Sequence, residues 1–110
     1  MSRLVIIERG EPNPSPMPRI RGVVYFIQAA PHTYKVGCTV DLERRLATLQ
    51  RHRNFPLRAV AVIDSDDYTR TEHIVQTHLR KQGLNLTGEW FVIDDASLSR
   101  VLTHFKGRWV

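Results

Sequence analysis

The sequence has little of what disulfide-bonded, zinc-binding and membrane proteins require. Its 110 residues include one cysteine, Cys38, which excludes an intramolecular disulfide and a zinc site made of several cysteines. No apolar run approaches the roughly 20 residues of a membrane-spanning helix. The apolar stretch at residues 4–7 is too short for the core of a signal peptide. We therefore expect a cytoplasmic protein that does not act at a membrane.

Several catalytic motifs are also missing. No glycine-rich phosphate loop is present, which disfavours nucleotide hydrolysis, and no serine lies in a nucleophile-elbow pattern. His73 and His78 do not share a face of the helix predicted there, so a metal-binding histidine pair is not expected. The acidic loop with Asp64, Asp66 and Asp67 lacks the glycine and the spaced ligands of a calcium loop.

The charge of the chain is strongly positive. The formal net charge is +5 and the sequence pI is near 10.0. Such a surplus favours a polyanionic partner, because neutralised phosphates release counterions. Most of the basic residues are arginines, whose planar guanidinium can bond two phosphate oxygens at once. A generally basic surface would have the same composition, so charge alone leaves both interpretations open.

The length and the hydrophobic fraction of 42% suit one domain with one modest core. Residues 10–18 hold four prolines, which predict an extended linker because proline fixes φ and removes a hydrogen-bond donor. Residues 1–18 are thus expected to form an N-terminal arm and a proline-rich linker. Residues 19–110 are expected to form the compact domain.

The pattern of apolar residues predicts strands and helices in a mixed order. β-branched and aromatic residues predict an antiparallel hairpin at 23–28 and 34–38 and a third strand at 58–63. Helical periodicity predicts three helices. The first follows Thr39 or Asp41 and ends near residue 53, the second covers residues 69–82, and the third follows Asp94 or Asp95. We predict an α+β fold in which three helices flank a small three-stranded antiparallel sheet, to which a short extended piece at 89–93 could add one strand.

Arg45 stands where helical periodicity would place an apolar residue. It shares an inward stripe with Leu42 and Leu49, whereas Arg44 is rotated by about 100° towards solvent. An inward arginine needs a partner, because an unpaired buried charge is costly. The partner could be a carboxylate of the protein or a phosphate held in a cleft, and an outward-reaching side chain would avoid the problem.

Glu72 and Lys35 are two further polar residues at informative positions. Glu72 shares a helical stripe with Val75, yet it also ends a Thr-x-x-Glu capping box, so it could cap its helix, bind a metal or do both. Lys35 shares one strand face with Gly37, which leaves room for a ligand or a close backbone. An exposed strand lysine would show the same pattern.

These positions together resemble the GIY-YIG nuclease superfamily. Residues 23–25 (VVY) stand where the family has Gly-Ile-Tyr, and residues 35–37 (KVG) stand in the place of Tyr-Ile-Gly. Arg45 lies at the catalytic position of the arginine helix, and Glu72 matches the metal-binding glutamate. A lysine replacing the second motif tyrosine, with GEWF at residues 88–91, is similar to the phage-derived DNA-binding branch.

The resemblance implies an endonuclease that hydrolyses DNA phosphodiester bonds with one Mg²⁺ or Mn²⁺ ion. Glu72 would be the only protein ligand of the metal, which Mg²⁺ tolerates when water and phosphate supply the other oxygens. Arg45 would neutralise charge on the phosphoryl oxygens. Tyr25 would position or deprotonate the attacking water. Lys35 would hold the phosphate or act as the base, which leaves the base unassigned.

Two functional interpretations follow, a nuclease and a DNA-binding module that does not cut. Neither excludes RNA, because a phosphate-directed site does not distinguish the sugars. We expect no attached DNA-reading domain within these 110 residues, so sequence specificity would need a homo-oligomer or a DNA-reading partner protein. In either case the expected phosphate contacts come from Arg44, Arg51, Arg53 and Lys81.

Overall fold

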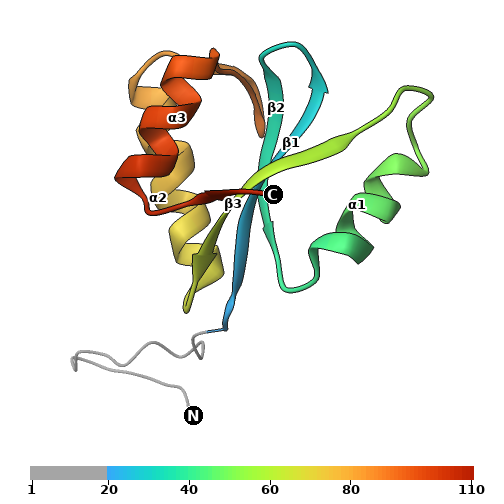
Figure 1. Cartoon of the computed structure of the whole chain (residues 1–110), viewed down its shortest axis with the longest axis horizontal. Coiled ribbons are helices and arrows are strands. Elements are labelled where there is room, and N and C mark those ends of the chain that lie inside the picture. The colour runs from blue at the N-terminus through green and yellow to red at the C-terminus, as the bar shows by residue number, and fades with distance from the viewer. Residues whose placement is uncertain (1–19) are drawn as a thin grey trace.

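Six strands and three helices make up residues 20–110, the part of the chain that this computed structural model describes (Figure 1). The predicted N-terminal arm and linker at residues 1–18 lie outside the described residues. The elements are β1 (Gly22–Ala30), β2 (Thr33–Thr39), α1 (Leu42–Gln50), β3 (Arg58–Ser65), α2 (Tyr68–Lys81), β4 (Asn85–Thr87), β5 (Trp90–Val92), α3 (Asp95–His104) and β6 (Arg108–Trp109).

The strands form one antiparallel sheet in the order β4-β5-β2-β1-β3-β6. The central strand β1 pairs with β2, as predicted for the hairpin, and on its other side with β3. The pairing of β2 with β5 is short and covers only Thr33–Lys35. Among the described residues, Gly37–Thr39 of β2 therefore have no strand partner on that side.

The prediction of a three-stranded sheet is wrong, although the α+β class is confirmed. The expected segments became β1, β2, β3 and β5, and the missing strands are β4 and β6 at the two edges. β4 has three residues and β6 has two, and all of them are exposed. Strands this short and uniformly exposed show no apolar alternation, so their existence depends on long-range pairing that a local pattern does not report.

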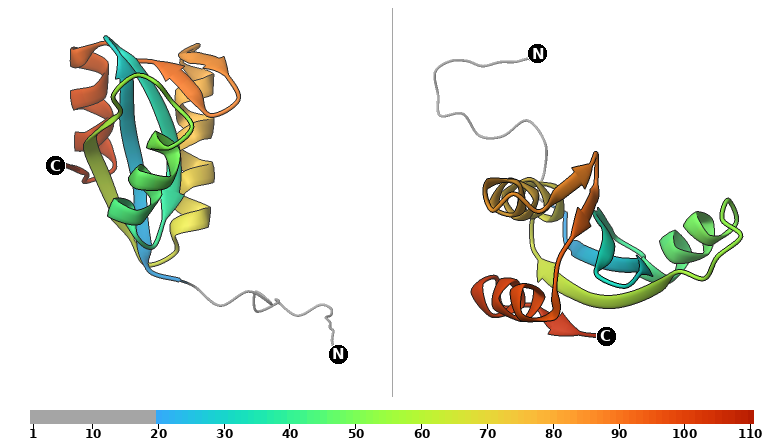
Figure 2. Two further views of the ribbon diagram at one scale, coloured as in Figure 1. Left: turned by 90° about the vertical axis from the view of Figure 1, so that its right-hand side faces the viewer. Right: turned by 90° about the horizontal axis from the view of Figure 1, so that it is seen from above.

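The sheet separates two apolar clusters. α2 and α3 cover one face and α1 covers the other (Figure 2). The larger cluster joins the sheet to α2 and α3 through residues such as Phe26, Val36 and Leu79. The smaller one joins Tyr25 and its neighbours to Leu49 and the other leucines of α1. Alternation along β1 explains the division, because successive side chains point to opposite faces.

The helix boundaries differ from the predicted ones at two informative places. Asp41 rather than Thr39 caps α1, since its carboxylate accepts a hydrogen bond from the backbone N–H of Arg44 at 3.0 Å. Helix α2 begins at Tyr68 after the N-cap residue Asp67. Thr69 therefore lies inside the helix. The predicted capping box, in which the Glu72 carboxylate would cap the helix that starts after Thr69, is wrong.

No helix within residues 20–110 is both long enough and apolar enough to cross a membrane.

Candidate active site

Tyr25 and Arg45 form the first half of the candidate site. Tyr25 lies on β1 and is buried, and its hydroxyl accepts a hydrogen bond from Nε of Arg45 at 3.4 Å. Arg45 is half-buried, whereas Arg44 is exposed, which confirms that Arg45 is the inward arginine of α1. Burial raises the pKa of the Tyr25 hydroxyl more than Arg45 lowers it. The hydroxyl is therefore protonated at neutral pH and can act as a hydrogen-bond donor.

Gly37 makes room for the ring of Tyr25. The two residues are direct partners across β1 and β2. A Cβ atom at position 37 would lie 2.6 Å from Cζ of Tyr25 and still closer to its hydroxyl oxygen. The space that the sequence left beside Lys35 is thus filled by the tyrosine that the candidate site uses.

Lys35 is held in place and is not a free surface lysine. Its Nζ lies 3.1 Å from Oε1 of Glu89, and only 15% of its side chain is exposed. Nζ also lies 5.7 Å from the centre of the Trp90 ring, within cation–π range. Glu89 was not among the predicted site residues. Its position follows from the β2–β5 register, in which Trp90 faces Lys35.

Glu72 approaches the site from α2, on the other side of the sheet. It lies beside Cys38 of β2, since each of the two groups shifts the pKa of the other. Burial and the charge of Glu89 raise the pKa of the Glu72 carboxyl. Burial, followed by Glu72, raises the pKa of the Cys38 thiol to about 12, so the thiol is not a nucleophile at neutral pH.

The open edge of β2 brings the two halves together. Cys38 lies on this edge, and both Glu72 and Arg45 act on its pKa, although they belong to helices on opposite faces. Because β5 stops pairing with β2 at Lys35, no strand of the described residues covers the edge of β2 beside Cys38. The site therefore combines two carboxylates, Glu72 and Glu89, with the cations Lys35 and Arg45 and the hydroxyl of Tyr25.

The donor set determines what metal ion the site could hold. Within residues 20–110, no three histidine, cysteine or acidic side chains converge as a metal cage. Mg²⁺ is commonly bound by one or two carboxylates together with water and substrate phosphate. Glu72 is half-buried, and within residues 20–110 no hydrogen bond or ion pair joins it to a cation, whereas Glu89 is paired with Lys35. The residues fit an ion that binds at Glu72 together with the phosphate.

The residues predicted to contact phosphate are spread over two regions. Arg44 and Arg51 are exposed on and just after α1. Arg53 is half-buried, with its guanidinium 5.7 Å from the centre of the Trp90 ring, so it borders the site. Lys81 is nine residues beyond Glu72 on α2, roughly 13 Å further along the helix. It lines a surface hollow with His78 and is separate from the site.

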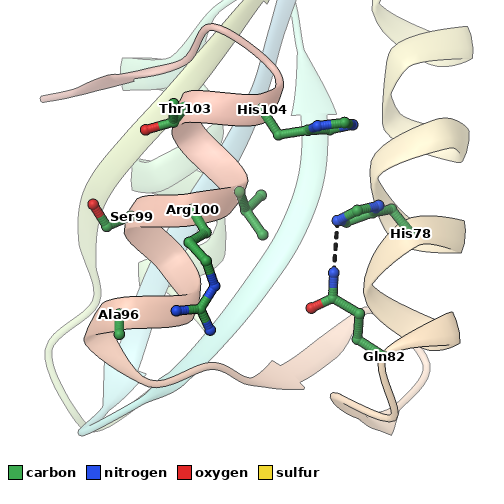
Figure 3. A pocket seen from close by; sticks show the side chains of 8 residues that line it. His78, Gln82, Ala96, Ser99, Arg100, Thr103 and His104 are labelled. Atoms are coloured by element: carbon green, nitrogen blue, oxygen red, sulfur yellow. Dashed lines mark hydrogen bonds between the residues drawn. The ribbon is translucent and has the colours of Figure 1, made fainter.

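A groove between α2 and α3 contains none of the candidate site residues (Figure 3). His78 of α2 stacks on His104 of α3 with ring centroids 5.1 Å apart. Nε2 of His78 lies 2.7 Å from the amide nitrogen of Gln82. Burial, with contributions from His104 and Lys81, lowers the pKa of His78.

The lowered pKa of His78 predicts that the fold loses stability in mild acid. The unfolded chain binds a proton at this residue near pH 6.5, before the folded chain does. Stability is therefore complete above about pH 6.5 and falls as the pH drops towards the lower folded value. We expect the melting temperature to fall between pH 7 and pH 5, and to fall less in His78→Gln. An unchanged pH dependence in the variant would contradict this assignment.

Comparison with protein families identifies the T5orf172 domain over residues 22–109 of the chain. This span contains every residue of the candidate site, from Tyr25 to Trp90. No curated protein and no solved structure matches the chain. The match does not test the GIY-YIG resemblance, which stays a prediction.

Proposed function

Because the chain belongs to the T5orf172 domain family, a phage-associated group of DNA-binding or nuclease-like domains, we propose that it is a metal-dependent endonuclease. Its reaction is the hydrolysis of DNA phosphodiester bonds, on a scaffold of the GIY-YIG type. The observation that carries the proposal is the convergence of the Tyr25–Arg45 pair and Glu72 at the open edge of β2. A module that only bound DNA would have little use for an acidic group beside phosphate.

Each side chain supplies one part of the chemistry. The Arg45 guanidinium has further N–H groups besides the Nε–H used by Tyr25, and these can neutralise charge on the phosphoryl oxygens. The protonated Tyr25 hydroxyl can orient the attacking water or donate to a phosphate oxygen. The ammonium of Lys35 adds a second positive charge. When Mg²⁺ or Mn²⁺ is bound at Glu72, it supplies Lewis-acid stabilisation of the phosphate and the leaving oxygen.

Plasmid nicking by paired arginine variants tests the proposal. Purified protein is incubated with supercoiled plasmid with and without Mg²⁺ or Mn²⁺. We expect metal-dependent nicking by the wild type. In Arg45→Ala, we expect the rate at saturating DNA to fall by roughly 10²–10³-fold, the scale for losing one preorganised stabilising donor. The adjacent, exposed Arg44→Ala should mainly weaken DNA binding, because its side chain points to solvent.

The same experiment separates the nuclease from a DNA-binding module. A wild type that shifts DNA on a gel but nicks it with no divalent metal would overturn the proposal and leave a binding function. An equal loss of nicking in both arginine variants would show that Arg45 has no special position. RNA of the same sequence is the parallel substrate, and cleavage of RNA alone would reassign the substrate class.

A further inference from the structure

Glu89 is a carboxylate of the site to which the proposed chemistry assigns no task. Its Oε1 lies 3.1 Å from Nζ of Lys35. Its charge also contributes to the raised pKa of Tyr25, Cys38 and Glu72. An acidic group in this position repels phosphate and weakens DNA binding, so its presence needs a compensating role.

The turn that carries Glu89 is fixed from three sides. Gly88 has φ of +55°, a conformation that favours glycine. Its carbonyl accepts hydrogen bonds from Nη2 of Arg80 at 3.0 Å and from Nδ2 of Asn85 at 2.9 Å. The carbonyl of Glu89 itself accepts one from the backbone N–H of Val36 at 2.9 Å. Contacts from α2, β4 and β2 therefore fix the backbone of the turn from which the Glu89 side chain reaches Lys35.

Lys35 is confined by this carboxylate and by an aromatic ring. A lysine side chain in solution samples many rotamers, and ordering it costs up to about 2 kcal/mol. Here Nζ is held between Glu89 and the ring of Trp90. An ammonium has three N–H donors, so the bond to Glu89 leaves two that can meet phosphate oxygens.

We propose that Glu89 is a positioning residue that holds the ammonium of Lys35 towards the phosphate to be cleaved. This inference rests on the proposed nuclease function, since it assigns a role within that site. It makes opposite predictions for binding and for cleavage. Removing the negative charge of Glu89 should strengthen DNA binding and slow the cleavage of bound DNA, because Lys35 is then no longer held.

A double-mutant cycle with Glu89→Gln and Lys35→Met tests the inference. Glutamine keeps the size of the side chain and removes its charge. For Glu89→Gln we expect cleavage at saturating DNA to fall by roughly ten- to a hundredfold, the scale for a charge-assisted hydrogen bond, with DNA affinity higher than that of the wild type. In the Lys35→Met background, Glu89→Gln should slow cleavage no further, because the two residues act as one unit. Glu89→Asp, which keeps the charge, should recover part of the rate.

Several results would overturn the positioning role. Rate losses that multiply in the double variant would mean that Glu89 acts independently of Lys35. A fall in both affinity and cleavage in Glu89→Gln would indicate a structural role for the turn. The matched control is Glu43→Gln, because Glu43 is an exposed glutamate of α1. This variant should show neither the slower cleavage nor the higher DNA affinity.

Failure of the nuclease proposal is recognised separately, because DNA affinity can be measured without cleavage. If the wild type never cuts DNA, the cycle is run on DNA binding alone. A positioned Lys35 contributes a phosphate contact, so Lys35→Met should weaken binding while Glu89 is present and weaken it less after Glu89→Gln. The same loss in both backgrounds would overturn the inference, whatever the outcome for cleavage.

Discussion

Replacing Glu72 by glutamine should abolish metal-dependent DNA cleavage and, without metal, make the protein more stable at neutral pH. The loss of cleavage follows from removing the carboxylate proposed to hold Mg²⁺, and we expect a decrease of roughly 10²–10³-fold or more. The gain in stability follows from the raised pKa of Glu72, which burial and Glu89 cause. A raised carboxyl pKa means that the ionised form destabilises the folded state, and neutral glutamine removes that cost.

The sign of the stability effect depends on pH. The folded chain binds the proton of Glu72 more tightly than the unfolded chain, so the wild type loses stability as the pH rises through both pKa values. The difference in melting temperature between Glu72→Gln and wild type should be largest at neutral pH in EDTA and should shrink below about pH 4. Glu43→Gln is the matched control, because Glu43 is exposed in the first turn of α1. Glu43→Gln should keep full cleavage. If Glu72→Gln still cuts DNA, Glu72 is not the metal ligand.

Gly37→Ala should disable the site by displacing Tyr25. The added Cβ would meet the phenol ring and its hydroxyl, so either the ring or the β1–β2 pairing must move. Overpacking of this kind costs about 1–3 kcal/mol, which corresponds to a fall in melting temperature of roughly 4–8 °C per kcal/mol in a domain of this size. Cleavage should be lost even at temperatures where circular dichroism shows a folded protein, because the hydroxyl bonded to Arg45 has moved.

Gly83→Ala separates loss of the site from loss of stability. Gly83 has φ of +74° with open space around it, so alanine there costs about 1–2 kcal/mol of backbone strain without touching the site. Both variants should melt at lower temperature than the wild type, but only Gly37→Ala should stop cutting. Full activity in folded Gly37→Ala would mean that the tyrosine hydroxyl has no part in the reaction.

Periodicity alone was sufficient for one half of the site. The 3.6-residue period of a helix separates Arg45 from Arg44, and the structure places the first against Tyr25 and the second in solvent. Alternation along a strand likewise put Lys35 and Gly37 on one face. Each of these inferences concerns neighbours within one element, where local geometry is nearly invariant.

The other half of the site depends on contacts between distant segments. Glu89 meets Lys35 because β5 pairs with β2 in one particular register, and register is set by packing across the whole sheet. The edge strands β4 and β6 have the same origin. The capping box at Thr69 failed because the helix begins one residue earlier, at Tyr68 after the N-cap position Asp67, and a sequence pattern does not fix a helix start to the residue.

The division of the interior by the sheet has a consequence for how the protein could move. α1 is attached through the small cluster around Leu49, whereas α2 and α3 share the large one. Detaching α1 would expose only the small cluster, so its opening costs less than unfolding the whole domain. Opening of the segment that bears Arg45 would therefore leave the face of the sheet covered by α2, which bears Glu72, intact.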